Sequence, residues 1–192
     1  LGFHFDDPLS LGWFALLGVA AGLVGIVYVK TFYGTRDLFH RLRIPPHFKP
    51  AIGGLLVGLI ALRFPQILAM GYGWLQFAVE GQTAQLAVGM MLALVVLKIV
   101  ATSLTIGSGG SGGVFAPGLF IGGMLGGAMW GLLDGHVAGL PPEPEPFVVV
   151  GMGALFGGVA KAPISVIIMV AEMTGEFTMI VPAMIATSVS YL

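Results

Sequence analysis

The residues best suited to bind a ligand lie in one glycine-rich stretch, Gly107 to Pro117, with the sequence GSGGSGGVFAP. This stretch separates two apolar runs, residues 86–106 and 114–133. A flexible linker in water would have a similar composition, but lipid offers no hydrogen bonds to exposed backbone. Irregular backbone between two membrane segments must therefore line a cavity or be covered by protein. We expect this turn to border a cavity.

Pro117 favours the start of a helix directly after the turn. Its missing N–H falls among the donors that have no partner in a first helical turn. The amides of Val114, Phe115 and Ala116 would then be free, at a helix end that carries about half a positive charge. Such an end can bind an anion without a charged side chain. The sequence therefore predicts an anion site at these three amides, in a turn formed by Gly112, Gly113 and Pro117.

Two ionisable side chains lie within or beside apolar runs. Lys98 is inside the run 86–106, and ionisable side chains in membrane segments usually face a water-filled cavity or a partner. Lys98 could contribute to pore electrostatics by attracting anions, or its long side chain could reach the lipid headgroups instead. Glu172 lies near the end of another apolar run, where the helix dipole disfavours a carboxylate. We expect Glu172 to have a partner, which the sequence does not identify.

Other chemistry fits the sequence less well. Gly107, Gly109 and Gly112 form a GxGxxG string with Asp134 downstream, but a dinucleotide site needs a soluble βαβ unit. No Gly-Lys-Ser/Thr follows the glycines, which excludes a Walker-type phosphate loop. The four histidines lack metal-ligand spacing, and no nucleophile with a base and an orienting group can be assembled. We predict neither an enzyme nor a bound cofactor or metal.

The composition places the chain in a membrane. Hydrophobic residues make up 57% of the sequence and charged residues 9%, whereas about a quarter of the residues of a soluble domain are charged. The net charge of -1, with only eight lysines and arginines, argues against a nucleic-acid partner. We therefore expect an integral membrane protein whose surroundings are lipid.

The elements that position the turn are expected to be helices of unequal length. Residues 10–33 are long enough to cross roughly 30 Å of hydrocarbon, whereas 147–160 and 163–173 are too short. Short segments interrupted by glycine and proline are typical of transporters with broken helices. Glycine pairs such as Gly54 and Gly58 are expected to let helices pack closely. The other predicted elements are a helix at 50–64, a partial or interfacial helix at 66–85, spans at 86–106 and 114–133, a loop at 134–146 and a final run at 178–192.

One loop is expected to carry most of the positive charge. By the rule that positive residues stay inside, this loop would face the cytoplasm. The chain also ends inside an apolar run, at Tyr191 and Leu192, which we interpret as a sign of a fragment. The five basic residues of the loop region are Lys30, Arg36, Arg41, Arg43 and Lys49.

The turn and the motifs around it resemble the CLC family of chloride channels and chloride/proton antiporters. The stretch GSGGSGGVFAP is similar to the GxFxP signature of that family. The likeness continues with Lys98-x-x-x-Thr102 before the signature, and with Gly151 to Pro163 and Ala171 to Gly175 after it. The resemblance covers nearly the whole chain, and two well-separated motifs in the right order make it specific.

The resemblance implies an all-α, polytopic membrane protein with tilted, broken and partial transmembrane helices. Residues 1–192 would form the C-terminal half of a CLC-type core, helices J to Q, which is one half of an inverted repeat. The first half and the last helix would be absent, and with them the serine loop, the gating and proton glutamates and the pore tyrosine. Tyr191 would not be that tyrosine, because it lies in helix Q and not in the helix after it. The family implies a multi-pass protein of the plasma or inner membrane and a homodimer, with interface candidates Ile164, Ile167, Ile168 and Ile185.

The function implied is transmembrane transport of chloride or a similar monovalent anion, coordinated by the amides of Val114, Phe115 and Ala116. Channel conduction and proton-coupled antiport both stay open, and so does the preferred anion. An alternative of a different class is a membrane scaffold or assembly subunit with the same fold and no transport. Because this chain would be only one wall of a pore, we expect no selective anion flux from it alone.

Overall fold

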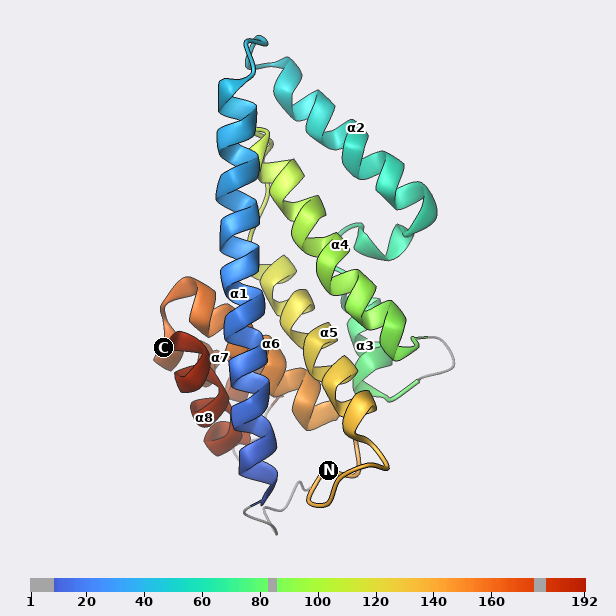
Figure 1. The fold of residues 1–192 in the computed structure, drawn as a ribbon, viewed down its shortest axis with the longest axis vertical. Helices are drawn as coiled ribbons and strands as arrows, with labels where there is room; N and C mark the ends of the chain where they lie inside the picture. The colour runs from blue at the N-terminus through green and yellow to red at the C-terminus, as the bar shows by residue number, and fades with distance from the viewer. Residues whose placement is uncertain (1–8, 83–85, 175–178) are drawn as a thin grey trace.

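A computed structural model describes residues 9–82, 86–174 and 179–192 of the chain. The sequence also predicts an N-terminal loop at residues 1–9; all of it but Leu9, which begins the first helix, lies outside the described residues, as does the start of the final run at 178. The described chain is all helical, as predicted, and its elements are joined by short connections (Figure 1). They are α1 (Leu9–Arg41), α2 (Phe48–Arg63), the short 3-10 helix η1 (Pro65–Ile67), α3 (Tyr72–Val79), α4 (Val88–Gly107), α5 (Phe115–Leu133), α6 (Glu145–Ala160), α7 (Pro163–Thr174) and α8 (Ile180–Tyr191).

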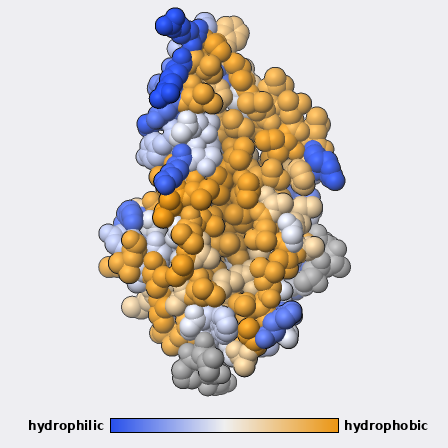
Figure 2. All heavy atoms as spheres, viewed as in Figure 1, coloured by the Kyte–Doolittle hydropathy of each residue, from blue (hydrophilic) through white to orange (hydrophobic). Residues whose placement is uncertain are grey.

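Three helices are long and apolar enough to cross a membrane: Ser10–Arg41, Val88–Gly107 and Phe115–Leu133. Helices α6 and α8 are apolar but shorter, and α3 has only 8 residues. The predicted mixture of helices long enough to span a membrane and shorter apolar helices is therefore found. Figure 2 shows the consequence for one face of the molecule, where hydrophobic residues cover the middle and hydrophilic ones gather mainly toward one end.

The prediction that the first span ends at residue 33 is wrong. Helix α1 continues to Arg41 and has 33 residues, a length of about 50 Å that exceeds the hydrocarbon core. His40 and Arg41 lie in its last turn, where positive charge is favoured by the helix dipole. Pro45 and Pro46 then prevent a longer helix. The expected basic loop is consequently reduced to residues 42–47, and most of its positive residues are helical.

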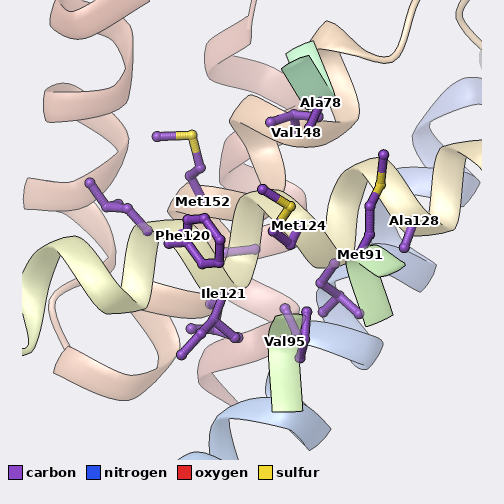
Figure 3. Close-up of a cluster of buried hydrophobic side chains, with 14 of the residues drawn as sticks. Ala78, Met91, Val95, Phe120, Ile121, Met124, Ala128, Val148 and Met152 are labelled. Carbon is purple, nitrogen blue, oxygen red and sulfur yellow. The ribbon is translucent and has the colours of Figure 1, made fainter. Parts of the chain in front are cut away.

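Helix α5 lies at the centre of the packing. Figure 3 shows its residues Phe120, Ile121, Met124 and Ala128 among side chains of the neighbouring helices. These four side chains are fully buried. They meet α3 at Ala78, α4 at Met91 and Val95, and α6 at Val148 and Met152. The helix that follows the glycine-rich turn is therefore held on three sides.

Glycines determine how closely the helices approach. A methyl group at Gly122 would collide with the carbonyl oxygen of Gly151, so α5 and α6 meet backbone to backbone. A Cβ at Gly18 of α1 would lie 2.9 Å from the Cα of Ala186 in α8. Nothing among the described residues lies within 4 Å of a Cβ at Gly54 or Gly58. The close packing predicted for that pair is therefore not found within this part of the chain.

Candidate functional site: a glycine-rich turn at a helix N-terminus

The first half of the glycine-rich turn is an ordered end of α4. Gly109 has φ 96°, which glycine adopts without steric cost. The N–H of Gly110 donates to the carbonyl of Thr105 at 3.1 Å, and that of Gly109 to the carbonyl of Ile106 at 2.9 Å. This pair of bonds is the Schellman arrangement that commonly ends a helix. The glycines therefore form a cap here and not a flexible linker.

After this cap the chain turns back and α5 begins part of the way along the molecule. Figure 1 shows the connection running down from the end of α4 to a helix that starts near the middle of the long axis. Helix α5 starts at Phe115 with Val114 as its N-cap residue. Its first backbone hydrogen bond joins the N–H of Gly118 to the carbonyl of Val114 at 3.1 Å.

The amides ahead of that bond are the predicted anion ligands. Pro117 has no N–H, and among the described residues no backbone carbonyl accepts from Val114, Phe115 or Ala116. The side chains of Val114 and Phe115 are 45% and 38% exposed, so this end of α5 is not covered by the described chain. The geometry is the one that leaves three donors available to a ligand.

A cavity of about 250 Å³ lies beside the turn. Gly112, Gly113 and Pro117 line it, so the structure brings all three predicted turn residues to one cavity. Lys98 lines the same cavity, although it lies in α4 well before the turn. The other lining residues are Val57, Ile67, Leu68, Ala69, Ala101, Thr102, Thr105 and Ile106.

Lys98 is buried, and its ammonium group is held by backbone oxygens. The side chain is 2% exposed, which shows that the headgroup alternative was wrong. Its Nζ donates to the carbonyls of Ile67 at 2.8 Å and Ala69 at 2.7 Å. It also lies 4.9 Å from the centre of the Phe120 ring. Within the described chain no carboxylate pairs with this charge.

Two positions near the site were missed in the sequence. Ala69 has φ 53°, which is uncommon for a residue other than glycine, and its carbonyl is one of the two that bind Lys98. Phe156 of α6 packs edge-on against Phe115, with ring centres 4.9 Å apart and planes at 88°. Neither contact has a signal in local spacing, because each joins segments that are distant in sequence.

The remaining candidates lie on the C-terminal helices. Ile164 and Ile168 are 74% and 53% exposed on α7, whereas Ile167 and Ile185 are half-buried. Glu172 is exposed, and the residues that the structure describes provide it with no ion pair. None of these positions lines the cavity beside the turn.

The fold and the site together define a class of protein. It is a helical membrane protein in which one span ends at a glycine-rich cap, and the next begins with three amides that have no backbone acceptor among the described residues, close to a cavity lined by Gly112, Gly113 and Pro117. The profile of the voltage gated chloride channel family matches residues 3–192 of the chain. The chain therefore belongs to the voltage-gated chloride channel, or CLC, family, and the resemblance noted in the motifs is confirmed.

The relatives with similar sequences include proteins named as a chloride channel protein and as an exchange transporter. A ClcB-like chloride channel protein of Ralstonia nicotianae is 35% identical over 194 residues, which are 98% of this chain and 44% of that protein. The H⁺/Cl⁻ exchange transporter ClcA of Yersinia pestis is 35% identical over 188 residues, which are 94% of this chain and 38% of that protein.

Solved structures show the same fold. A slow cyanobacterial Cl⁻/H⁺ antiporter matches with a TM-score of 0.81 and 27% identity, over 96% of this chain and 43% of that one. A CLC-type fluoride/proton antiporter matches with a TM-score of 0.84 and 24% identity, over 100% of this chain and 46% of that one. The chain thus spans less than half the length of each of these four proteins.

Proposed function

We propose that this chain is part of a transporter that moves chloride or a similar monovalent anion across a membrane. The observation that carries the proposal is that α5 starts with three amides that have no backbone acceptor within the described residues. The names of the relatives support it, since they describe a chloride channel protein and an H⁺/Cl⁻ exchanger. The proposal includes both passive conduction and proton-coupled antiport. The scaffold alternative has no support among these relatives.

The strength of a helix-end site suits an ion that must also leave. Two unit charges 4 Å apart attract by about 4 kcal/mol at an effective dielectric constant of about 20. A helix end carries about half a charge and would contribute about half that energy. A transported ion needs a site that replaces its hydration without retaining it. The amides of Val114, Phe115 and Ala116 meet this requirement better than direct contact with a cation.

Lys98 would act on the ion from the wall of the cavity that Gly112, Gly113 and Pro117 line, although Val114, Phe115 and Ala116 are not themselves lining residues. Its ammonium has three donors, and two of them bind the carbonyls of Ile67 and Ala69. These contacts fix the positive charge in place, so its effect on the anion would be a steady attraction through the cavity. We assign Lys98 to the electrostatics of the pathway, and the three amides to contact with the ion.

The family also implies a setting in the cell. We propose that the full-length protein is a multi-pass protein of the plasma or inner membrane and works as a homodimer. Ile164 and Ile168 are the best interface candidates because both are exposed apolar side chains on α7. Ile167 and Ile185 are half-buried within the chain and would contribute less.

The amide site can be tested by moving its proline by one position. In the full-length protein, Ala116→Pro with Pro117→Ala removes the N–H of residue 116 and restores one at 117. Hydrogen bonds to charged groups contribute about 1.5–3 kcal/mol, so we expect anion affinity to fall by about tenfold or more. Affinity is measured by calorimetry with chloride, and transport by chloride efflux from liposomes.

Helix α8 offers a matched control, since it begins with Ile180, Val181 and Pro182 and so has its proline in the same third position. Val181→Pro with Pro182→Ala should leave chloride affinity and efflux per folded protein unchanged, because α8 does not line the cavity. Unchanged affinity in the α5 variant, or an equal loss in the α8 control, would contradict the amide site.

A further inference from the structure

The first turn of α5 carries the proposed anion ligands, and one face of this helix is a stripe of glycines. Gly118, Gly122 and Gly126 recur every four residues, so they lie on the same side of the helix. A Cβ at Gly122 would collide with the Gly151 carbonyl oxygen, and one at Gly126 with that of Phe147. Helix α6 therefore lies directly against this stripe, in a register that the backbones themselves determine.

That register places Phe156 of α6 over the first glycine of the stripe. A Cβ at Gly118 would lie 2.9 Å from Cδ2 of the Phe156 ring, closer than real side-chain atoms approach. Gly118 follows Phe115 by three residues, so both lie on one face of the first turn. The Phe156 ring covers that face, because it also meets the Phe115 ring edge-on at 4.9 Å.

The contact matters because the described chain covers Phe115 only in part: it is 38% exposed, and the Phe156 ring lies on its covered side. Edge-to-face pairs prefer a defined angle between their rings, so Phe156 restricts where the Phe115 ring can lie. The Phe115 amide is one of the three proposed ligands. The side chain on the same residue therefore stands next to the ion, and its position bears on which ion fits.

We propose that Phe156 is a positioning residue of the anion site and a determinant of anion selectivity. It holds the Phe115 ring and the first turn of α5, so that the free amides keep one orientation. Phe156 does not touch the ion. This inference rests on the proposed function, because it assigns a selectivity role around the same amides.

The test compares Phe156→Leu and Phe156→Ala with the wild type in the full-length protein. Flux from liposomes gives the chloride-to-nitrate selectivity ratio, calorimetry gives chloride affinity, and thermal melting in detergent shows whether each variant is folded. Given the size of an aromatic pair interaction, we expect the selectivity ratio to change by about two- to tenfold. The leucine variant fills most of the volume, which keeps the test usable if the alanine variant does not fold.

Phe77 is a matched control, since its ring also packs edge-on, but against Trp74 at 5.6 Å and not against Phe115 in the first turn of α5. Phe77→Leu should leave the selectivity ratio unchanged. Phe115→Leu should change the selectivity ratio. The double variant Phe115→Leu with Phe156→Leu should change the ratio little more than either single variant, because both substitutions remove the same ring contact.

Folded Phe156 variants with wild-type selectivity and affinity would overturn the role of Phe156 and leave the amide site standing. Fully additive effects in the double variant would also overturn it. A wild-type protein that neither binds nor transports chloride would overturn the proposed function and this inference together.

Discussion

Lys98 lines the cavity, and its ammonium is held by contacts that its sequence position does not indicate. The charge of a lysine in an apolar run can be placed at low free-energy cost in a water-filled cavity or in the headgroup region. Here its ammonium is bonded to two backbone carbonyls, that of Ile67 at the end of η1 and that of Ala69 in the connection between η1 and α3, and the residue lines the cavity. A buried charge is costly unless it is hydrogen-bonded, and these carbonyls provide that compensation without cancelling the charge.

Replacing Lys98 with glutamine separates its charge from its hydrogen bonds. Lys98→Gln keeps N–H donors for the carbonyls of Ile67 and Ala69 but removes the positive charge from the cavity wall. We expect a folded protein with weaker chloride affinity. The loss of affinity should be larger at low salt than at high salt, because salt screens the effect of the charge. Chloride titrations at two ionic strengths measure both.

Lys161 provides the matched control for this change. Its Nζ donates to the carbonyl of Tyr191 at 2.8 Å and lies 4.4 Å from the centre of the Tyr191 ring. Lys161 does not line the cavity beside the glycine-rich turn. Lys161→Gln therefore removes a charge with the same kinds of contact. Equal affinity losses in the two variants, or none in Lys98→Gln, would show that the charge of Lys98 does not act on the anion.

At the scale of helices, glycine decides which pairs can approach closely. Gly122 and Gly151 allow α5 and α6 to touch through their backbones, and this contact sets the position of the first turn of α5. Gly58 of α2 is also a helical glycine, but no described residue lies within 4 Å of where its Cβ would be. Identical residues thus have different roles, which depend on the neighbouring helix.

Alanine substitutions should therefore have opposite effects at these two glycines. We expect Gly122→Ala to destabilise the protein by about 1–3 kcal/mol or more, since overpacked sites cannot relax freely. Gly58→Ala should be neutral or stabilising by up to about 1 kcal/mol, because alanine is the better helix former. Thermal melting of both variants in detergent measures the difference, and similar melting temperatures would contradict the α5–α6 packing described here.

The glycine-rich turn and most helices could be predicted from the sequence, because apolar runs and helix-start residues are local signals. The predicted end of α1 was wrong, because residues 34–41 are polar enough for a loop and yet continue the helix to Arg41. The partners of Lys98 and the contact between Phe115 and Phe156 could not be predicted. Both depend on how helices distant in sequence pack against each other. For the same reason the close contacts predicted for Gly54 and Gly58 were wrong for the described chain.

At the scale of the whole molecule, the proposed anion site is one-sided in this chain. Val114 and Phe115 are exposed at the start of α5, and the chain spans 38% to 44% of the two named relatives. A conducting pathway needs ligands on all sides of the ion. The full-length protein is therefore the molecule in which the site has to be examined, and the absence of flux from this chain alone stays a prediction.

The most direct measurement is the position of bromide in crystals of the full-length protein, since bromide replaces chloride and is located by its anomalous scattering. We predict bromide within hydrogen-bonding distance of the amides of Val114, Phe115 and Ala116, and loss of that peak when the proline is moved from position 117 to 116. Bromide elsewhere, or those three N–H groups bonded to carbonyls of the rest of the protein, would contradict the account.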